Sequence, residues 1–388
     1  MRAHFDLLTV FFYLVLGLVS YILVTRMMRP ANSVPYRGAT GKSSQQHGAF
    51  LLFIFLFTFF ATFRMVTGEI GGADALNYVR NFNTILTGSA LEIDIGRDLE
   101  PGFQLFTKII RHITSDYHIY FLIVYGFICY AYLRFIRANC PKGLIYTPFI
   151  LIMYLYLRSF NTMRTSFAIS FVLIGLTLMD KKKWLSLLFI VASVFIHRIS
   201  IMFVPVWIYY YLFNNRLNNL SRVKFVLITG VGIVLLYLTA LQIQSLIGIT
   251  IDLEENDIYY ATHNMGENHF ERFPLVMGHL LLYGALVFFY DRIKWDGQSV
   301  FLRTLFIYDF FMVPIGVVFG VWRFVEYFYL VRLSLWSIII YSIACRKSKD
   351  NRKIIYLASL VLFGAWLYYR IYKEWDQAYI SPYILDMF

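Results

Sequence analysis

Two arginines, Arg158 and Arg164, frame the segment of this sequence that points most directly to chemistry. Ser159 or Asn161, between them, can cap the helix that follows, and the free amides and dipole at its start attract an anion. A guanidinium presents a planar fork that suits phosphate oxygens and stays charged when partly buried. The segment therefore predicts a diphosphate clamp, with arginines that reach from helix ends to lipid headgroups as the alternative.

His197 and Arg198 lie in the middle of a long apolar stretch. A histidine there can act as a general base near neutral pH or donate to a phosphate oxygen. The alternative is a structural histidine at a helix break. The neighbouring Arg198 favours the functional interpretation and is itself a candidate ligand for the anion.

Two carboxylates precede these residues in the chain. Asp74 can deprotonate a hydroxyl group, or it can cap a helix, because Asp is among the preferred N-cap residues. Glu100 can be a catalytic acid or base, or it can mark a helix start, because Pro101 follows it at the first helical position. Both stay candidates for catalysis.

A third group of candidates lies near the C-terminal end of the sequence. Arg323 and Glu326 are neighbours on one helical face. They form a self-contained pair, or Arg323 contacts the ligand while Glu326 orients it. Arg332 lies about 13 Å deeper at the rise of a helix, where a charge needs a partner or a water-filled cavity. We expect all three to contribute to ligand binding.

These residues must be positioned by helices in a membrane. The chain is 59% hydrophobic and 15% charged, whereas a soluble domain is about one quarter charged. The apolar runs predict an all-α polytopic membrane protein with about 12 spans, or one fewer if the pair around His197 is a single interrupted helix. The candidate spans are residues 5–25, 49–66, 118–136, 144–158, 162–179, 184–197, 198–213, 224–248, 274–290, 300–320, 324–344 and 354–371.

The connecting segments predict the orientation of the chain. Lys and Arg gather around 26–42, 134–142, 181–183, 216–224, 292–294 and 346–353, and the positive-inside rule places these segments in the cytoplasm. This clustering also accounts for the net charge of +12 without nucleic acid as a partner. The alternate segments, including the long loops 64–117 and 249–272, are neutral or acidic and therefore external, as are both termini. The first loop predicts two short amphipathic helices, the second with an apolar stripe of Phe103, Phe106, Ile109, Ile110 and Ile113. We treat residues 1–388 as a single transmembrane domain.

Metal and nucleotide chemistry lacks support in the sequence. His263, His269 and His279, with Glu267 and Glu271, match no metal-binding motif. The three scattered cysteines form neither a disulfide framework nor a zinc pattern, and no phosphate-binding glycine loop occurs in a supporting context. We expect no metal and no cofactor.

The order of the candidate residues resembles the EpsG family of bacterial exopolysaccharide and O-antigen polymerases, the Wzy-type enzymes. Asp74 and Tyr78 stand in the first external loop, and Glu100-Pro-Gly-Phe103 follows. The arginine corner comes next, and then His197 with Ser200 nearby. The likeness covers most of the chain.

The resemblance implies a GT-C-like membrane glycosyltransferase of the bacterial inner membrane, with its active face periplasmic. It would move a growing glycan from undecaprenyl diphosphate onto another lipid-linked repeat unit, with inversion and without a metal. His197 or Asp74 would be the base. Tyrosines near the external ends, Tyr78 among them, can stack on sugar rings, although an aromatic belt at the membrane interface explains most of them. The implied partners are the undecaprenyl-diphosphate-linked oligosaccharide, membrane lipid, and a chain-length regulator and flippase of the same pathway.

Two other functions fit the same sequence. A ligase of related type would move a finished glycan onto lipid A core or another acceptor. A flippase or secondary transporter would carry out no covalent chemistry. Transporters show internal repeats and midplane charges, whereas this sequence has no visible repeat and gathers its charges at one face, which favours an enzyme.

Overall fold

The computed structural model describes residues 6–28, 40–67, 70–72, 74–85, 99–139, 155–217, 220–250, 269–319, 324–378 and 383–385. Within these residues every regular element is a helix, and Arg64 and Leu385 form an isolated antiparallel bridge. Runs rich in Leu, Ile, Val and Phe form helices in lipid because a helix pairs its own backbone donors and acceptors without water. The predicted all-helical membrane protein is confirmed at this level.

Four of the described helices are long and apolar enough to cross a membrane, namely Leu7–Met27, Tyr117–Asn139, Arg222–Ile243 and Gly297–Val318. Shorter apolar helices cover Gln46–Thr62, Met163–Leu178, Lys183–Ile196, Arg198–Leu212 and Tyr329–Ala344. Most of the predicted span 144–158 and of the loop 249–272 lies outside the described residues. The number of about 12 spans and the external termini therefore stay predictions.

The chain divides into two compact units. Unit 1 contains Met1–Val204 and Lys347–Phe388, and unit 2 contains Pro205–Arg346. One helical bundle can divide in this way as readily as two separate domains, so the single transmembrane domain stays a prediction.

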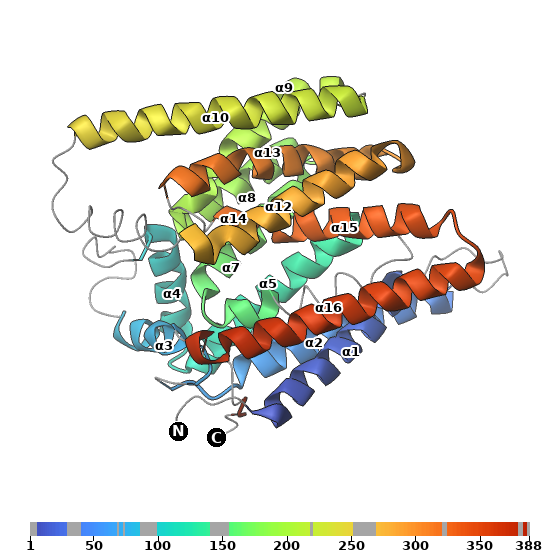
Figure 1. Cartoon of the computed structure of the whole chain (residues 1–388). Helices are drawn as coiled ribbons and strands as arrows, with labels where there is room; N and C mark the ends of the chain where they lie inside the picture. Colours follow the sequence, from blue (N-terminus) through green and yellow to red (C-terminus); the bar gives the residue numbers. More distant parts are fainter. Residues whose placement is uncertain are drawn as a thin grey trace. The chain divides into compact units, whose positions relative to one another are not determined.

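Unit 1 carries most of the candidate site. Its chain packs in order, because α1 lies against α2, α2 against α5, α5 against α7 and α7 against α8, while α16 lies along α1 (Figure 1). The segment near the C-terminus returns to the start of α1, where the Tyr383 N–H donates to Thr9 Oγ1 at 2.8 Å. The helices of unit 1 are α1 Leu7–Met28, α2 Thr40–Thr62, α3 Ala75–Thr84, α4 Pro101–Ile113, α5 Tyr117–Asn139, α7 Met163–Leu178, α8 Lys183–Ile196, the 3-10 helix η1 Arg198–Met202, and α16 Lys349–Ala378.

Helices α3 and α4 are the two short helices predicted in loop 64–117, and their presence is confirmed. The predicted apolar stripe on α4 is partly buried and partly exposed. Phe103 and Ile110 are buried, whereas Ile109 and Ile113 are 48% and 74% exposed. The buried face of α4 also includes polar Gln104 and Thr107, because Gln104 Nε2 donates to the Leu99 carbonyl and Thr107 Oγ1 to the Phe103 carbonyl.

In unit 2, α13 packs against α10, α12 and α15. Gly232 of α10 allows the close approach to α13, because a Cβ there would lie 2.6 Å from the Phe311 ring. Apolar residues such as Val223, Leu227 and Val231 of α10 are exposed, as expected for a helix that faces lipid. The helices of unit 2 are α9 Phe203–Leu217, which begins at the boundary, α10 Arg222–Thr250, α12 His269–Phe289, η2 Tyr290–Arg292, α13 Gly297–Phe319, α14 Phe324–Tyr327 and α15 Tyr329–Ala344.

Candidate functional site

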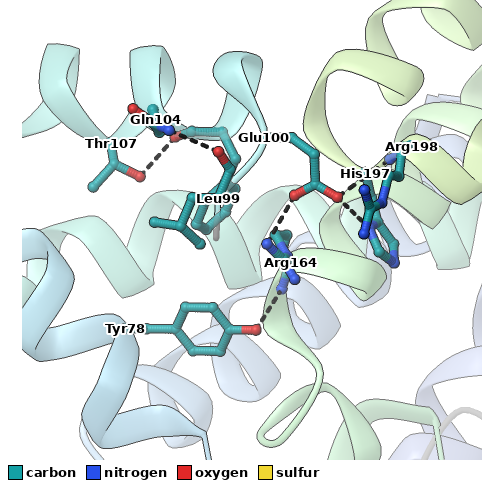
Figure 2. A network of polar contacts seen from close by, with 9 residues as sticks. Tyr78, Leu99, Glu100, Gln104, Thr107, Arg164, His197 and Arg198 are labelled. Carbon is teal, nitrogen blue, oxygen red and sulfur yellow. Dashed lines mark hydrogen bonds and ion pairs between the residues drawn. The ribbon is translucent and has the colours of Figure 1, made fainter. Parts of the chain in front are cut away.

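Three side chains that are far apart in the sequence meet at one carboxylate in unit 1. His197 Nδ1 lies 2.7 Å from Glu100 Oε1, and Arg164 Nη1 lies 2.8 Å from Glu100 Oε2 (Figure 2). The Arg198 backbone N–H also donates to Glu100 Oε1, at 3.3 Å. The structure thus brings together one predicted carboxylate, the predicted histidine and one arginine of the predicted clamp.

The local sequence around Glu100 explains how its carboxylate reaches this place. Glu100 is the N-cap of α4, and Pro101 occupies the first turn, where a missing N–H costs nothing. The Glu100 side chain makes no capping hydrogen bond to α4, so its carboxylate points to His197 and Arg164 instead. Glu100 therefore begins the helix, as one of the two interpretations expected, and its carboxylate also enters the polar cluster. Its catalytic role stays a prediction.

Gly102 sets the distance between α4 and α8. A Cβ at Gly102 would lie 2.7 Å from both the Cβ and the carbonyl oxygen of Phe195. Phe195 is two residues before His197, so this glycine lets the start of α4 come close enough for the carboxylate to reach the imidazole. The close approach of α4 to α8 thus explains why a glycine follows Glu100 and Pro101.

His197 lies at a break between two helices. Whether they form two short spans or one interrupted span stays a prediction. It ends α8 with an extended backbone, φ −153° and ψ 112°, and η1 begins at the next residue. Its backbone N–H still donates to the Ser193 carbonyl at 2.8 Å, which fixes the end of α8. The imidazole is 3% exposed.

Arg164 lies in the first turn of α7, but the predicted helix caps are wrong. The N-cap is Thr162, not Ser159 or Asn161, and its side chain makes no capping hydrogen bond. The Ser159 hydroxyl donates to the Tyr156 carbonyl instead, because that acceptor is nearer in its own helical turn. The Arg164 backbone N–H donates to the Tyr78 hydroxyl of α3 at 3.4 Å, so a tyrosine takes the place of a cap.

The electrostatics of this cluster keep Glu100 ionised. Burial alone raises the pKa of the Glu100 carboxyl, but the hydrogen bond from His197 and the charge of Arg164 outweigh it and hold that pKa below its usual value. Burial raises the pKa of Tyr78 to about 12, against a smaller opposing effect of Arg164. Near neutral pH the cluster therefore contains a carboxylate, a neutral phenol and two cationic arginines.

The Glu100–His197 contact has the geometry of an acid–base couple. A carboxylate only accepts hydrogen bonds, so the facing Nδ1 carries the proton and Nε2 carries the lone pair. Nε2 is buried and makes no hydrogen bond within the described part of the chain. An oriented imidazole with an unused lone pair can accept a proton from a hydroxyl group.

The remaining candidates of unit 1 are placed as follows. Arg198 is exposed. Arg158 is half-buried, and its backbone carbonyl accepts from the N–H groups of Asn161 and Thr162, which forms the corner before α7. Asp74 is exposed at the N-cap of α3 and makes no capping hydrogen bond. Tyr78 is half-buried on the same helix.

Arg64 packs against the corner before α7. It is 1% exposed and stands over the rings of Phe121, Tyr125 and Phe160, the last at 4.1 Å. Its guanidinium donates to the carbonyls of Ala61 and Gly71 and to the Tyr125 hydroxyl. Arg64 is thus a structural cation and supports the segment that carries Arg164.

Unit 2 contains a second, separate polar cluster at Arg332. Its Nε lies 3.4 Å from Asp309 Oδ2 and its Nη1 lies 2.9 Å from His279 Nε2. Asp309 and His279 are fully buried. The charge of Arg332 is therefore paired by protein side chains. The predicted contact of Arg332 with ligand stays a prediction. Glu326 is buried in α14, and Arg323 lies outside the described residues.

Sequence reasoning missed Gly102, Gly72 and Asp309. Asp309 stands alone in an apolar run, which is the signal that identified Arg332 and could have identified its partner. Gly72 has φ +117°, and a Cβ there would overlap the Phe160 carbonyl, so it brings the start of α3 against the corner. Two glycines, by contrast, carry no chemical signal, because their roles depend on which helices approach each other.

The fold and this cluster define a multi-pass membrane protein with an oriented acid–base couple beside a guanidinium. The EpsG family model matches residues 49–385, and the chain belongs to the EpsG family. This is a family of exopolysaccharide and Wzy-type polymerases, so the predicted resemblance is confirmed. No curated protein and no solved structure matches the chain. Membership makes the protein a glycosyltransferase-type membrane enzyme that acts on a lipid-linked oligosaccharide.

Proposed function

We propose that the protein is a GT-C-like polysaccharide polymerase of the cytoplasmic membrane. It transfers a growing glycan from undecaprenyl diphosphate to a lipid-linked repeat unit at the external face. Family membership supports the polymerase class. The observation that carries the chemistry is the contact of 2.7 Å between His197 Nδ1 and Glu100 Oε1, which leaves Nε2 without a hydrogen bond in the described structure.

In the proposed reaction, His197 Nε2 takes the proton of the acceptor hydroxyl. The acceptor oxygen bonds to the anomeric carbon of the donor glycan from the side opposite the diphosphate. The bond between that carbon and the diphosphate oxygen breaks, and the electron pair leaves with undecaprenyl diphosphate. The product is inverted at the anomeric carbon. Glu100 holds the imidazole in the correct tautomer and stabilises the imidazolium that forms.

Arginines stabilise the charge on the leaving diphosphate in this proposal. Arg164 lies beside the couple, and Arg198 follows His197 with an exposed side chain. Arg158 belongs to the corner before α7 and is the third candidate. Preorganised cations at a developing negative charge lower the barrier, so we expect turnover to be unaffected by a metal chelator.

Elongation of purified lipid-linked repeat units by the protein alone, in vesicles, tests this function. The proposal predicts a ladder of lipid-linked products, each longer by one repeat, with and without chelator. Transfer of a preformed chain to lipid A core without elongation would identify a ligase. Bound substrate that crosses the membrane without any new glycosidic bond would identify a transporter.

Matched substitutions test which residue is the base. His197→Gln should lose about 100-fold or more in turnover, the usual contribution of a general base, while Asp74→Asn should keep most of it. The control is His118→Gln. His118 Nδ1 also contacts a carboxylate, Asp116 Oδ1 at 3.0 Å, but that carboxylate is 51% exposed. Loss of turnover in Asp74→Asn alone would transfer the role of base to Asp74.

A further inference from the structure

The Glu100 carboxylate is shared between the imidazole of His197 and the guanidinium of Arg164. Each contact uses a different oxygen, Oε1 for His197 and Oε2 for Arg164. The three side chains are only 3%, 13% and 19% exposed, in the order His197, Glu100 and Arg164. Water screens such enclosed charges poorly. The positive charge of Arg164 at Oε2 therefore weakens the stabilisation that the carboxylate gives to a protonated His197 at Oε1.

The Arg164 contact is the less specific of the two. Arg164 Nη1 is at ion-pair distance from Glu100 Oε2, but among the described residues that oxygen has no hydrogen bond of good geometry. His197, in contrast, makes a directed hydrogen bond to Oε1. A diphosphate offers several charged oxygens that match the fork of a guanidinium, and it therefore competes well with one carboxylate oxygen.

The backbone of Arg164 is held independently of its side chain. Its N–H donates to the Tyr78 hydroxyl, and it lies in the first turn of α7. The guanidinium can consequently change partners without any movement of the helix.

We propose that Arg164 couples donor binding to the basicity of His197. The donor diphosphate draws the guanidinium from Glu100 Oε2 onto its own oxygens. The carboxylate then stabilises the protonated imidazole alone, and His197 becomes a stronger base only when a donor is in place. This inference rests on the proposed function, in which His197 accepts the proton of the acceptor hydroxyl.

The charged groups around His197 allow a change in the basicity of its imidazole to be measured. Glu100 of α4 is ionised because its pKa is lowered, and Tyr78 of α3 is neutral because its pKa is about 12. Arg164 of α7 and Arg198 of η1 stay charged at all working pH values. None of these neighbours of His197 therefore changes its charge near neutral pH.

The test compares two pH profiles of elongation. The ratio kcat/KM for the donor reports the base in the free enzyme, and kcat reports it in the complex. In Arg164→Met the free enzyme lacks the competing cation, so the acid limb of kcat/KM should move up by about one pH unit. The acid limb of kcat should stay where it is in the wild type, because there Arg164 has already left Glu100.

The control is Arg198→Met, which removes an exposed arginine next to His197 without removing a side chain from the carboxylate. We expect neither limb to move by a comparable amount. Three results would overturn the proposal: unmoved limbs in Arg164→Met, an equal shift of both limbs, or the same shift in Arg198→Met. If His197→Gln instead keeps the wild-type acid limb, His197 is not the base. Failure of the proposed function can thus be distinguished from failure of the coupling through Arg164.

A binding measurement gives the same answer without turnover. Binding of undecaprenyl diphosphate should be accompanied by uptake of a proton on His197, so its affinity should rise as the pH falls. The rise should be about tenfold larger in the wild type than in Arg164→Met, which is the one-unit shift expressed as an affinity. Equal rises in both proteins would contradict the coupling.

Discussion

Replacing Gly102 with alanine tests how the Glu100–His197 couple is positioned. The added Cβ would lie 2.7 Å from Phe195 Cβ and 2.7 Å from its carbonyl oxygen. Carbon atoms in contact prefer about 3.5–4.0 Å, so the start of α4 must withdraw from α8 by about 1 Å. The contact of 2.7 Å between Glu100 and His197 would then lengthen beyond hydrogen-bond distance.

The expected effect falls on the rate more than on the stability. Overpacking costs about 1–3 kcal/mol, partly offset by the better helix propensity of alanine, about 1 kcal/mol. A displacement of about 1 Å in a catalytic group can cost about 100-fold in rate. We therefore expect kcat for elongation to fall by about two orders of magnitude while protein level and unfolding temperature change little.

The assay is elongation of lipid-linked repeats by purified protein, with thermal unfolding measured on the same sample. Gly126→Ala is the matched control, because a Cβ at Gly126 in α5 meets its nearest atom, in Thr58, at 3.7 Å. It should keep wild-type activity. Full activity of Gly102→Ala would show that the close approach of α4 and α8 has no part in orienting His197.

Three further predictions concern the buried cluster of unit 2, the topology and the acid stability. Asp309→Ala leaves the buried Arg332 without its carboxylate, so stability should fall by about 3–5 kcal/mol in thermal unfolding, and adding Arg332→Met should restore part of it; an unchanged unfolding temperature would contradict this. A membrane-impermeant maleimide should label Asp74→Cys but not the exposed native Cys345 in intact cells, because the positive-inside rule puts Cys345 in the cytoplasm; labelling of Cys345 from outside would reverse the topology. The pKa of Glu100 is lowered in the folded protein, so its stabilising effect is complete above the usual carboxyl pKa and is lost as the pH falls through the folded value. The difference in unfolding temperature between the wild type and Glu100→Gln should therefore shrink below about pH 4, and a difference that grows there would be the wrong sign.

The sequence predicted the helical elements well because spans are encoded locally. A run of about 20 apolar residues has few alternatives to a helix in a bilayer, and α5, for example, spans Tyr117–Asn139 against a prediction of 118–136. The break at His197 was visible as an ambiguity because two apolar runs meet there. The buried face of α4 was not predictable in the same way. Gln104 and Thr107 can be buried because they donate to the Leu99 and Phe103 carbonyls, and apolar periodicity does not record such bonds.

For the site, the sequence identified chemical types but not partners. His197, Glu100 and Arg164 were each selected because ionisable groups in apolar surroundings are costly and functional by default. Their meeting at one carboxylate depends on contacts between residues almost 100 positions apart, which no local pattern records. For the same reason Asp309 and Arg332 were not recognised as a pair, and Gly102 was passed over.

We propose that His197 is the general base and that Glu100 orients it. The most direct measurement is the rate of a single addition with donor and acceptor already bound, in His197→Gln compared with His118→Gln, together with the affinity of each for the donor. We expect His197→Gln to bind donor normally but to add a repeat about 100-fold or more slowly, while His118→Gln matches the wild type. A wild-type rate in His197→Gln would contradict it.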